Sequence, residues 1–181
     1  MQFTEKIKEY DQVISQEMFE KLPHYLQKKN WGLNASDPQY QPHKKFWGMI
    51  LSEEPFFNQA IFSRIKTLTE RDFTISRIIA NAQSTLQDGS PHHDDISANS
   101  WTFILYCNSD WDYQWGGQTV FFDRYRTPNG EIDIVSNRVH NVYPIPNTGV
   151  LFPGNMMHYA QGPNRDFYEV RYSVAWHLKE I

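Results

Sequence analysis

The stretch that decides the fold runs from residue 88 to residue 95 and reads DGSPHHDD. It opens as a turn, because glycine and proline interrupt regular structure. Two overlapping His-x-Asp pairs follow, and side chains two residues apart in an extended segment point the same way. Two imidazoles and one carboxylate form an open iron(II) site, so one pair would supply two of its three ligands. His92 with Asp94 and His93 with Asp95 both fit, and the position of the turn favours the first pair.

The third ligand has to come from a more distant part of the chain, and His158 is the best candidate. It follows a strand-like stretch, residues 151–154, that ends in Pro-Gly. His140 and His177 compete for this role, but both are interpreted as ordinary sheet residues. Farther on, Arg171 lies in a β pattern, where its guanidinium could pair with a buried carboxylate.

The hydrophobic pattern separates a helical N-terminal third from a β-rich remainder. Helices are predicted over residues 16–29, with Ser15 as N-cap and Pro23 as a disturbance, and over residues 55–69. A short strand is predicted at 10–14, a loop at 38–42 and a hairpin turn at Asn129-Gly130. Further strands are predicted at residues 73–82, 101–106, 118–122, 139–143, 150–152 and 170–176. Together these elements predict an α+β fold with a β-barrel or sandwich core and helices packed outside.

Composition excludes several classes of protein. The chain has 181 residues and a formal net charge of −4, which argues against a broad nucleic-acid groove. Its single cysteine, Cys107, rules out a disulfide framework, a thiolate zinc site and an iron–sulfur cluster. No apolar run is long enough to predict a membrane span, and no apolar signal core is found, so a cytoplasmic location is expected. One domain is predicted over residues 1–181, with 1–70 as helical support and 71–181 as the β-barrel core.

Residues 73–178 resemble the iron(II)- and 2-oxoglutarate-dependent dioxygenases of the prolyl 4-hydroxylase type. Several separate motifs in the family's order carry this resemblance, which makes it more specific than any one of them. They are DGSPHHDD at 88–95, TFILYCN at 102–108, DW at 110–111, GGQT at 116–119, GVLFPG at 149–154 and RYSVAW at 171–176.

The resemblance implies a double-stranded β-helix, a flattened jelly-roll barrel of two antiparallel sheets. It implies that His92, Asp94 and His158 bind iron(II), and that Arg171 pairs with the distal carboxylate of 2-oxoglutarate, assisted by the hydroxyl of Tyr106. Ser173 lies on the same strand face as Arg171 and could add a hydrogen bond. The interval between His158 and Arg171 is longer than the family pattern, which leaves Arg165 as an alternative anchor.

The reaction implied by the resemblance is hydroxylation of an unactivated C–H bond with dioxygen, releasing succinate and CO2. The substrate would be a small molecule, an amino acid or a prolyl or peptidyl group. Asn81, Gln83 and Trp115 are candidates for the substrate pocket, although Asn81 and Gln83 could equally satisfy a sheet edge. The retained carboxylate of Asp94 favours hydroxylation or desaturation over halogenation. Two alternatives are a non-catalytic binding module on the same barrel and a cupin-like metalloenzyme that uses no 2-oxoglutarate.

Overall fold

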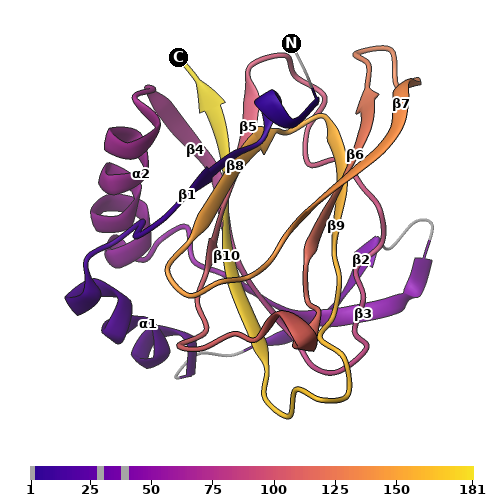
Figure 1. Ribbon diagram of the computed structural model, residues 1–181. Helices are drawn as coiled ribbons and strands as arrows, with labels where there is room; N and C mark the ends of the chain where they lie inside the picture. The colour runs from indigo at the N-terminus through magenta and orange to yellow at the C-terminus, as the bar shows by residue number, and fades with distance from the viewer. Residues whose placement is uncertain (1–2, 28–30, 38–40) are drawn as a thin grey trace.

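Two antiparallel β-sheets face each other in the computed structural model, which describes residues 3–27, 31–37 and 41–181 (Figure 1). Within these residues, the larger sheet has the strand order β1-β8-β5-β10-β4-β3-β2 and the smaller one the order β7-β6-β9. The strands are β1 (Lys8–Tyr10), β2 (Gly32–Asp37), β3 (Gln41–Ile50), β4 (Phe73–Gln83), β5 (Ser100–Tyr106), β6 (Thr119–Arg126), β7 (Ile132–Val142), β8 (Gly149–Pro153), β9 (Met156–Ala160) and β10 (Arg171–Glu180).

The space between the two sheets is filled by apolar side chains from both. Phe121 of β6 contacts Phe152 of β8, with ring centroids 4.8 Å apart, and Ile104 and Val150 belong to the same buried cluster. Alternation along the strands explains the arrangement, because every second side chain points inward. The predicted α+β class and double-stranded β-helix are therefore confirmed.

Helices cover the outer face of the larger sheet, as the sequence predicted (Figure 1). These are α1 (Gln16–Gln27) and α2 (Phe62–Thr69), the latter preceded by π-helical turns at Phe56–Ile61. Two short 3-10 helices lie outside this layer, at Phe3–Lys6 and, between β5 and β6, at Tyr113–Trp115. Phe57 and Ile65 are fully buried in the cluster beneath them, and the Trp176 indole of β10 donates a hydrogen bond to the Phe57 carbonyl (3.1 Å). Burial of this second apolar layer fixes the outer face of the barrel wall.

Three local predictions differ from the structure. The first strand lies at Lys8–Tyr10 rather than at 10–14, and it pairs with β8. Gln41 and Pro42 belong to β3 and not to a loop, whereas 38–40 lie outside the described residues. The helix α1 continues through Pro23 to Gln27, and residues 28–29 lie outside the described part.

Two other local predictions agree with the structure. Ser15 caps α1, accepting a hydrogen bond from the Met18 amide (3.3 Å). His158 follows the predicted strand, which is β8, and lies inside β9, a further strand that the sequence analysis did not predict.

Within the described residues, no helix is long and apolar enough to cross a membrane.

Candidate metal centre

Backbone pairing brings the two distant histidines together. His92 lies in the connection between β4 and β5, and His158 lies in the middle of β9. The two residues form an isolated antiparallel bridge: the His92 amide donates to the His158 carbonyl (2.9 Å) and the His158 amide to the His92 carbonyl (3.0 Å). The Asp94 amide donates to the carbonyl of Gly154, in the turn between β8 and β9 (2.9 Å). The fold therefore places all three residues through main-chain contacts.

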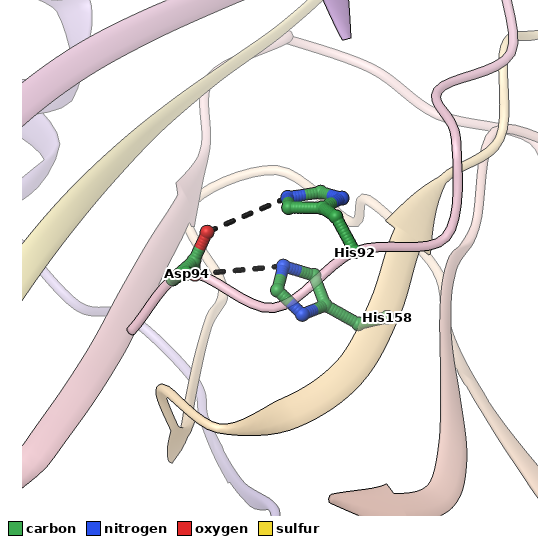
Figure 2. Close-up of side chains that lie close together, drawn as sticks. All are labelled: His92, Asp94 and His158. Atoms are coloured by element: carbon green, nitrogen blue, oxygen red, sulfur yellow. Dashed lines mark ion pairs between the residues drawn. The ribbon is translucent and has the colours of Figure 1, made fainter. Parts of the chain in front are cut away.

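Their side chains converge on one point, as Figure 2 shows. The Nε2 atom of His92 lies 3.4 Å from Oδ1 of Asp94, and Nε2 of His158 lies 3.5 Å from Oδ2. One potential ligand atom from each residue lies within 4.8 Å of the others. The neighbouring pair does not converge, because Asp95 instead binds the Lys179 ammonium (2.7 Å). The structure thus brings together the first of the two possible His-x-Asp pairs.

Second-layer contacts orient each of these side chains. Nδ1 of His92 lies 2.8 Å from the Ser90 carbonyl, and Nδ1 of His158 lies 3.0 Å from the Met156 carbonyl. A carbonyl only accepts, so both rings carry their proton on Nδ1, and the Nε2 lone pairs remain for a metal. The Thr102 hydroxyl donates to Oδ2 of Asp94 (2.5 Å).

Burial sets the charges of the site. Desolvation lowers the pKa of His158 to about 4, so this imidazole is neutral near pH 7. Burial alone would raise the pKa of Asp94, but the facing histidine rings, His158 first, outweigh it and hold that pKa well below its ordinary value. The centre therefore offers two imidazole nitrogens and one carboxylate, which is the donor set of an open iron(II) site.

The competing histidines lie in different places. His140 is on β7, with Nε2 3.0 Å from a carboxylate oxygen of Glu9, outside the centre. His177 is closer than expected for an ordinary sheet residue, because its Nδ1 lies 3.8 Å from Oδ1 of Asp94. Its Nε2 accepts a hydrogen bond from the Arg77 guanidinium (3.1 Å). His177 therefore lies beside Asp94, at the edge of the metal centre.

A second polar cluster surrounds Arg171, at the other end of the barrel interior. Arg171 is 1% exposed, and its guanidinium donates to the Gly117 carbonyl (2.7 Å), to Oε1 of Gln83 (2.9 Å) and to the hydroxyls of Ser173 (3.3 Å) and Thr119 (3.4 Å). All these acceptors are uncharged, and Arg171 has no carboxylate partner among the described residues. Desolvation lowers its pKa below the ordinary value. A buried guanidinium without a counter-ion is a site for an anion.

Tyr106 completes this cluster. Its hydroxyl donates to Oγ1 of Thr119 (2.8 Å), and the Arg171 guanidinium carbon lies 5.6 Å from the centre of its ring. Burial raises the pKa of Tyr106 to about 12, so the phenol stays protonated. By contrast Arg165, the alternative anchor, is exposed to solvent.

The three candidates for a substrate pocket do not line one common pocket: Asn81 and Gln83 are neighbours on β4, and Trp115 lies elsewhere. Gln83 is fully buried and accepts a hydrogen bond from Arg171, so it belongs to the polar cluster around Arg171. Asn81 lies on the same face of β4, opposite Ser173. Trp115 lines a separate cavity of about 210 Å³ beside Phe167, with ring centroids 4.9 Å apart.

Sequence reasoning missed three contributors: Thr102, Gly117 and Thr119. Thr102 and Thr119 lie in predicted strands and inside quoted motifs, TFILYCN and GGQT, but nothing in these motifs marks their contacts. Strand alternation could have placed Thr102 on the same face as Tyr106. The role of the Gly117 carbonyl depends on a backbone position that no residue pattern reveals.

Comparison with known proteins gives a consistent result. The family model of the 2OG-Fe(II) oxygenase superfamily matches residues 80–178, more than half of the chain. Among solved structures, a prolyl-4-hydroxylase of Pseudomonas putida is 13% identical with a TM-score of 0.66, covering 97% of this chain and 93% of that one. A prolyl hydroxylase of Trichoplax adhaerens, in complex with a hypoxia inducible factor peptide, is 15% identical with a TM-score of 0.67, covering 97% and 84%.

A further similar structure is HygX of Streptomyces hygroscopicus with nickel and 2-oxoglutarate bound, at 9% identity and a TM-score of 0.69, covering 96% of this chain and 82% of that one. No curated protein sequence matches the chain. At these identities the structural likeness shows a shared fold.

Proposed function

Because the chain belongs to the 2OG-Fe(II) oxygenase superfamily, we propose that it is an oxygenase that hydroxylates an unactivated C–H bond. The family uses iron(II), 2-oxoglutarate and dioxygen. Succinate and CO2 would be released with the product. We treat residues 1–181 as one oxygenase domain, and propose a cytoplasmic location, where iron(II) and 2-oxoglutarate are both supplied.

The convergence of His92, Asp94 and His158 is the observation that carries the proposal. The residues fit iron(II) by their chemistry: the rings present Nε2 lone pairs, and the carboxylate is ionised. Phe152 packs against the His158 ring with centroids 4.6 Å apart, and Phe121 packs at 6.0 Å. These aromatic rings cover the His158 ring and would exclude water from that side of the site, and a metal held by the three residues would keep positions for cosubstrate and oxygen.

The Arg171 cluster fits 2-oxoglutarate. Its guanidinium is buried, held by four uncharged acceptors and without a carboxylate partner in the described chain. The distal carboxylate of 2-oxoglutarate would supply the missing negative charge, and the Tyr106 and Thr119 hydroxyls lie beside the same position. Arg171, Tyr106 and Thr119 would hold this end of the cosubstrate, and its keto acid end would be left free to reach the metal.

When bound, iron(II) and 2-oxoglutarate supply the oxidising chemistry, and the protein supplies position and a dry site. No side chain has to act as a nucleophile. Asp94 would supply a carboxylate ligand to the metal, which supports hydroxylation or desaturation rather than halogenation. Similar structures hold a peptide in one case and hygromycin B in another, so the fold itself leaves open whether the substrate is a small molecule, an amino acid or a prolyl or peptidyl group.

The test is an anaerobic titration of the metal-free protein with iron(II) and then 2-oxoglutarate, following the visible charge-transfer band of the chelate. The band should form in the wild type and be strongly weakened in Asp94→Ala. Asp95→Ala is the matched control, since Asp95 binds Lys179 and should leave the band intact. Arg171→Gln should raise the concentration of 2-oxoglutarate needed for the band about 100-fold or more, as expected for lost charge-assisted hydrogen bonds.

The alternatives predict different results. Iron binding without the band would indicate a metalloenzyme that uses no 2-oxoglutarate. No iron binding would indicate a binding module. Either result would contradict the proposed function.

A further inference from the structure

An open cavity reaches the candidate metal centre at Asp94. The cavity has a volume of about 250 Å³, and Asp94 forms part of its wall together with Arg77, Trp101, Thr102 and His177. Along the ladder of β10 and β4, Arg171 pairs with Gln83 at one end and His177 pairs with Arg77 toward the other. These four positions lie on one face of the sheet, because paired residues face the same side and the positions along each strand are an even number of residues apart. Arg77 itself is exposed to solvent. Asp94 is thus the one of the three candidate ligands that lines the cavity, and the Arg171 cluster lies farther along the ladder.

The charges of this cavity do not balance once a metal is bound. Asp94 would be neutralised as a ligand, and Asp95 is already paired with Lys179 at 2.7 Å. Arg77 forms no ion pair with any carboxylate of the described residues. Its guanidinium donates instead to Nε2 of His177, an uncharged acceptor. One positive charge therefore remains at the cavity, facing a volume that can hold a ligand.

Contacts on each side limit how the cavity can rearrange. The Arg77 guanidinium donates one hydrogen bond to Nε2 of His177 (3.1 Å), which fixes the direction in which its remaining N–H groups are offered. The Trp101 indole donates to Glu180 (2.9 Å), and the Arg71 guanidinium carbon lies 4.1 Å from the centre of its ring. Trp101 is thereby held as one apolar wall of the cavity.

We infer that this cavity is the substrate subsite and that Arg77 binds the carboxylate of a small carboxylic acid, such as a free amino acid. The inference rests on the proposed function and names its substrate class. The cavity, of about 250 Å³, has room for a molecule the size of an amino acid. The planar guanidinium matches a carboxylate through two parallel hydrogen bonds, while the Trp101 wall contacts the carbon skeleton.

The experiment compares carboxylic acids with their primary amides on the protein loaded anaerobically with iron(II) and 2-oxoglutarate. The probes are L-proline and L-prolinamide, L-leucine and L-leucinamide, and benzoate and benzamide. Binding is read from the shift of the charge-transfer band, and turnover from succinate release after oxygen is admitted. At least one acid should shift the band, and its amide should bind about tenfold or more weakly, since tenfold corresponds to about 1.4 kcal/mol.

Arg77→Gln should abolish the preference for the acid while the band itself still forms without a probe. Arg77→Lys keeps the charge but loses the planar fork, and should retain part of the preference. Arg64→Gln is the matched control, because Arg64 is an exposed arginine on the outer helix α2 and should change nothing.

Equal binding of acids and amides, an unchanged preference in Arg77→Gln, or no band shift with any acid would overturn the inference while the proposed function stands. Failure of the chelate band itself, before any probe is added, would remove both.

Discussion

A methyl group added at Gly117 should weaken 2-oxoglutarate binding without touching the metal ligands. Gly117 has a positive φ of +73°, and a Cβ built there would lie 2.5 Å from Cζ2 of Trp111 and 3.3 Å from Cδ of Arg171. Trp111 is buried, so it has little room to move. Because the Gly117 carbonyl also accepts from Nε of Arg171 at 2.7 Å, any shift of this backbone misplaces the guanidinium.

The loss of folding stability in Gly117→Ala has two parts, backbone strain and steric overlap, and a second glycine allows them to be measured separately. Gly130 also has a positive φ (+87°), but nothing lies within 4 Å of a Cβ built there. Gly130→Ala should therefore cost only the backbone strain, about 1 kcal/mol. Gly117→Ala adds about 1–3 kcal/mol of overpacking. Loss of one charge-assisted hydrogen bond to the anchor, about 1.5–3 kcal/mol, corresponds to an approximately 10- to 100-fold weaker 2-oxoglutarate complex.

Urea denaturation measures the free energy of unfolding of both variants, and the charge-transfer titration measures their affinity for 2-oxoglutarate. The reasoning is refuted if Gly117→Ala unfolds like Gly130→Ala, or if it binds 2-oxoglutarate as tightly as the wild type. Iron(II) affinity serves as the internal control and should be the same in all three proteins.

Three further predictions concern the metal centre. Thr102→Val removes the hydrogen bond to Asp94 and should weaken metal binding about 10- to 100-fold, measured by calorimetry. Thr102→Ser keeps the hydroxyl and should bind metal with the affinity of the wild type. Equal affinities of the two variants would argue against orientation of Asp94 by this hydroxyl. The pKa of His158 is about 4 when folded and about 6.5 when unfolded, so the unfolded chain takes up a proton first and the metal-free protein should lose stability as pH falls from about 6.5 to about 4. Urea titrations of His158→Gln should show a smaller loss and those of His140→Gln the full one; an identical loss in His158→Gln would count against the assignment. Metal at about 100 times its dissociation constant should add about 2.7 kcal/mol of stability, and therefore raise Tm, reversibly with a chelator; His92→Ala should show no such gain.

The pattern of the sequence was sufficient for the barrel core, because inward-pointing positions there are apolar at every second residue. The predicted strand at residues 73–82 corresponds to β4, and the predicted strand at 101–106 to β5. The antiparallel pair of β2 and β3 was not predicted, because its residues lack such an alternating apolar pattern. Residues 32–46 are mostly polar and contain glycine, asparagine and proline, so they show no alternation. The extended form of residues 32–37 and 41–46 depends on pairing, such as that of Asn34 with Phe46, which the sequence does not display.

The site was predictable to the extent that it depends on short spacing. The His-x-Asp pair and the strand of Arg171 carry local patterns. In the structure His92 and Asp94 converge with His158, and Arg171 lies on β10. The contact of Gln83 involves instead a side chain 88 residues away in sequence, that of Arg171. The sequence therefore indicated only a candidate for the substrate pocket at this position. Arg77 and His177 likewise gain meaning only from the ladder that sets them side by side.

The ladder of β4 and β10 also limits how this enzyme can change. Arg171 and His177 share one strand, and an insertion of one residue between them would turn one side chain out of the barrel. An insertion of two residues would keep both on that face but move them about 7 Å farther apart. Strand length thus sets how far the buried Arg171 cluster lies from His177, the residue whose Nδ1 is 3.8 Å from Asp94. Side chains can be exchanged along this ladder, but its length cannot be changed without altering that spacing.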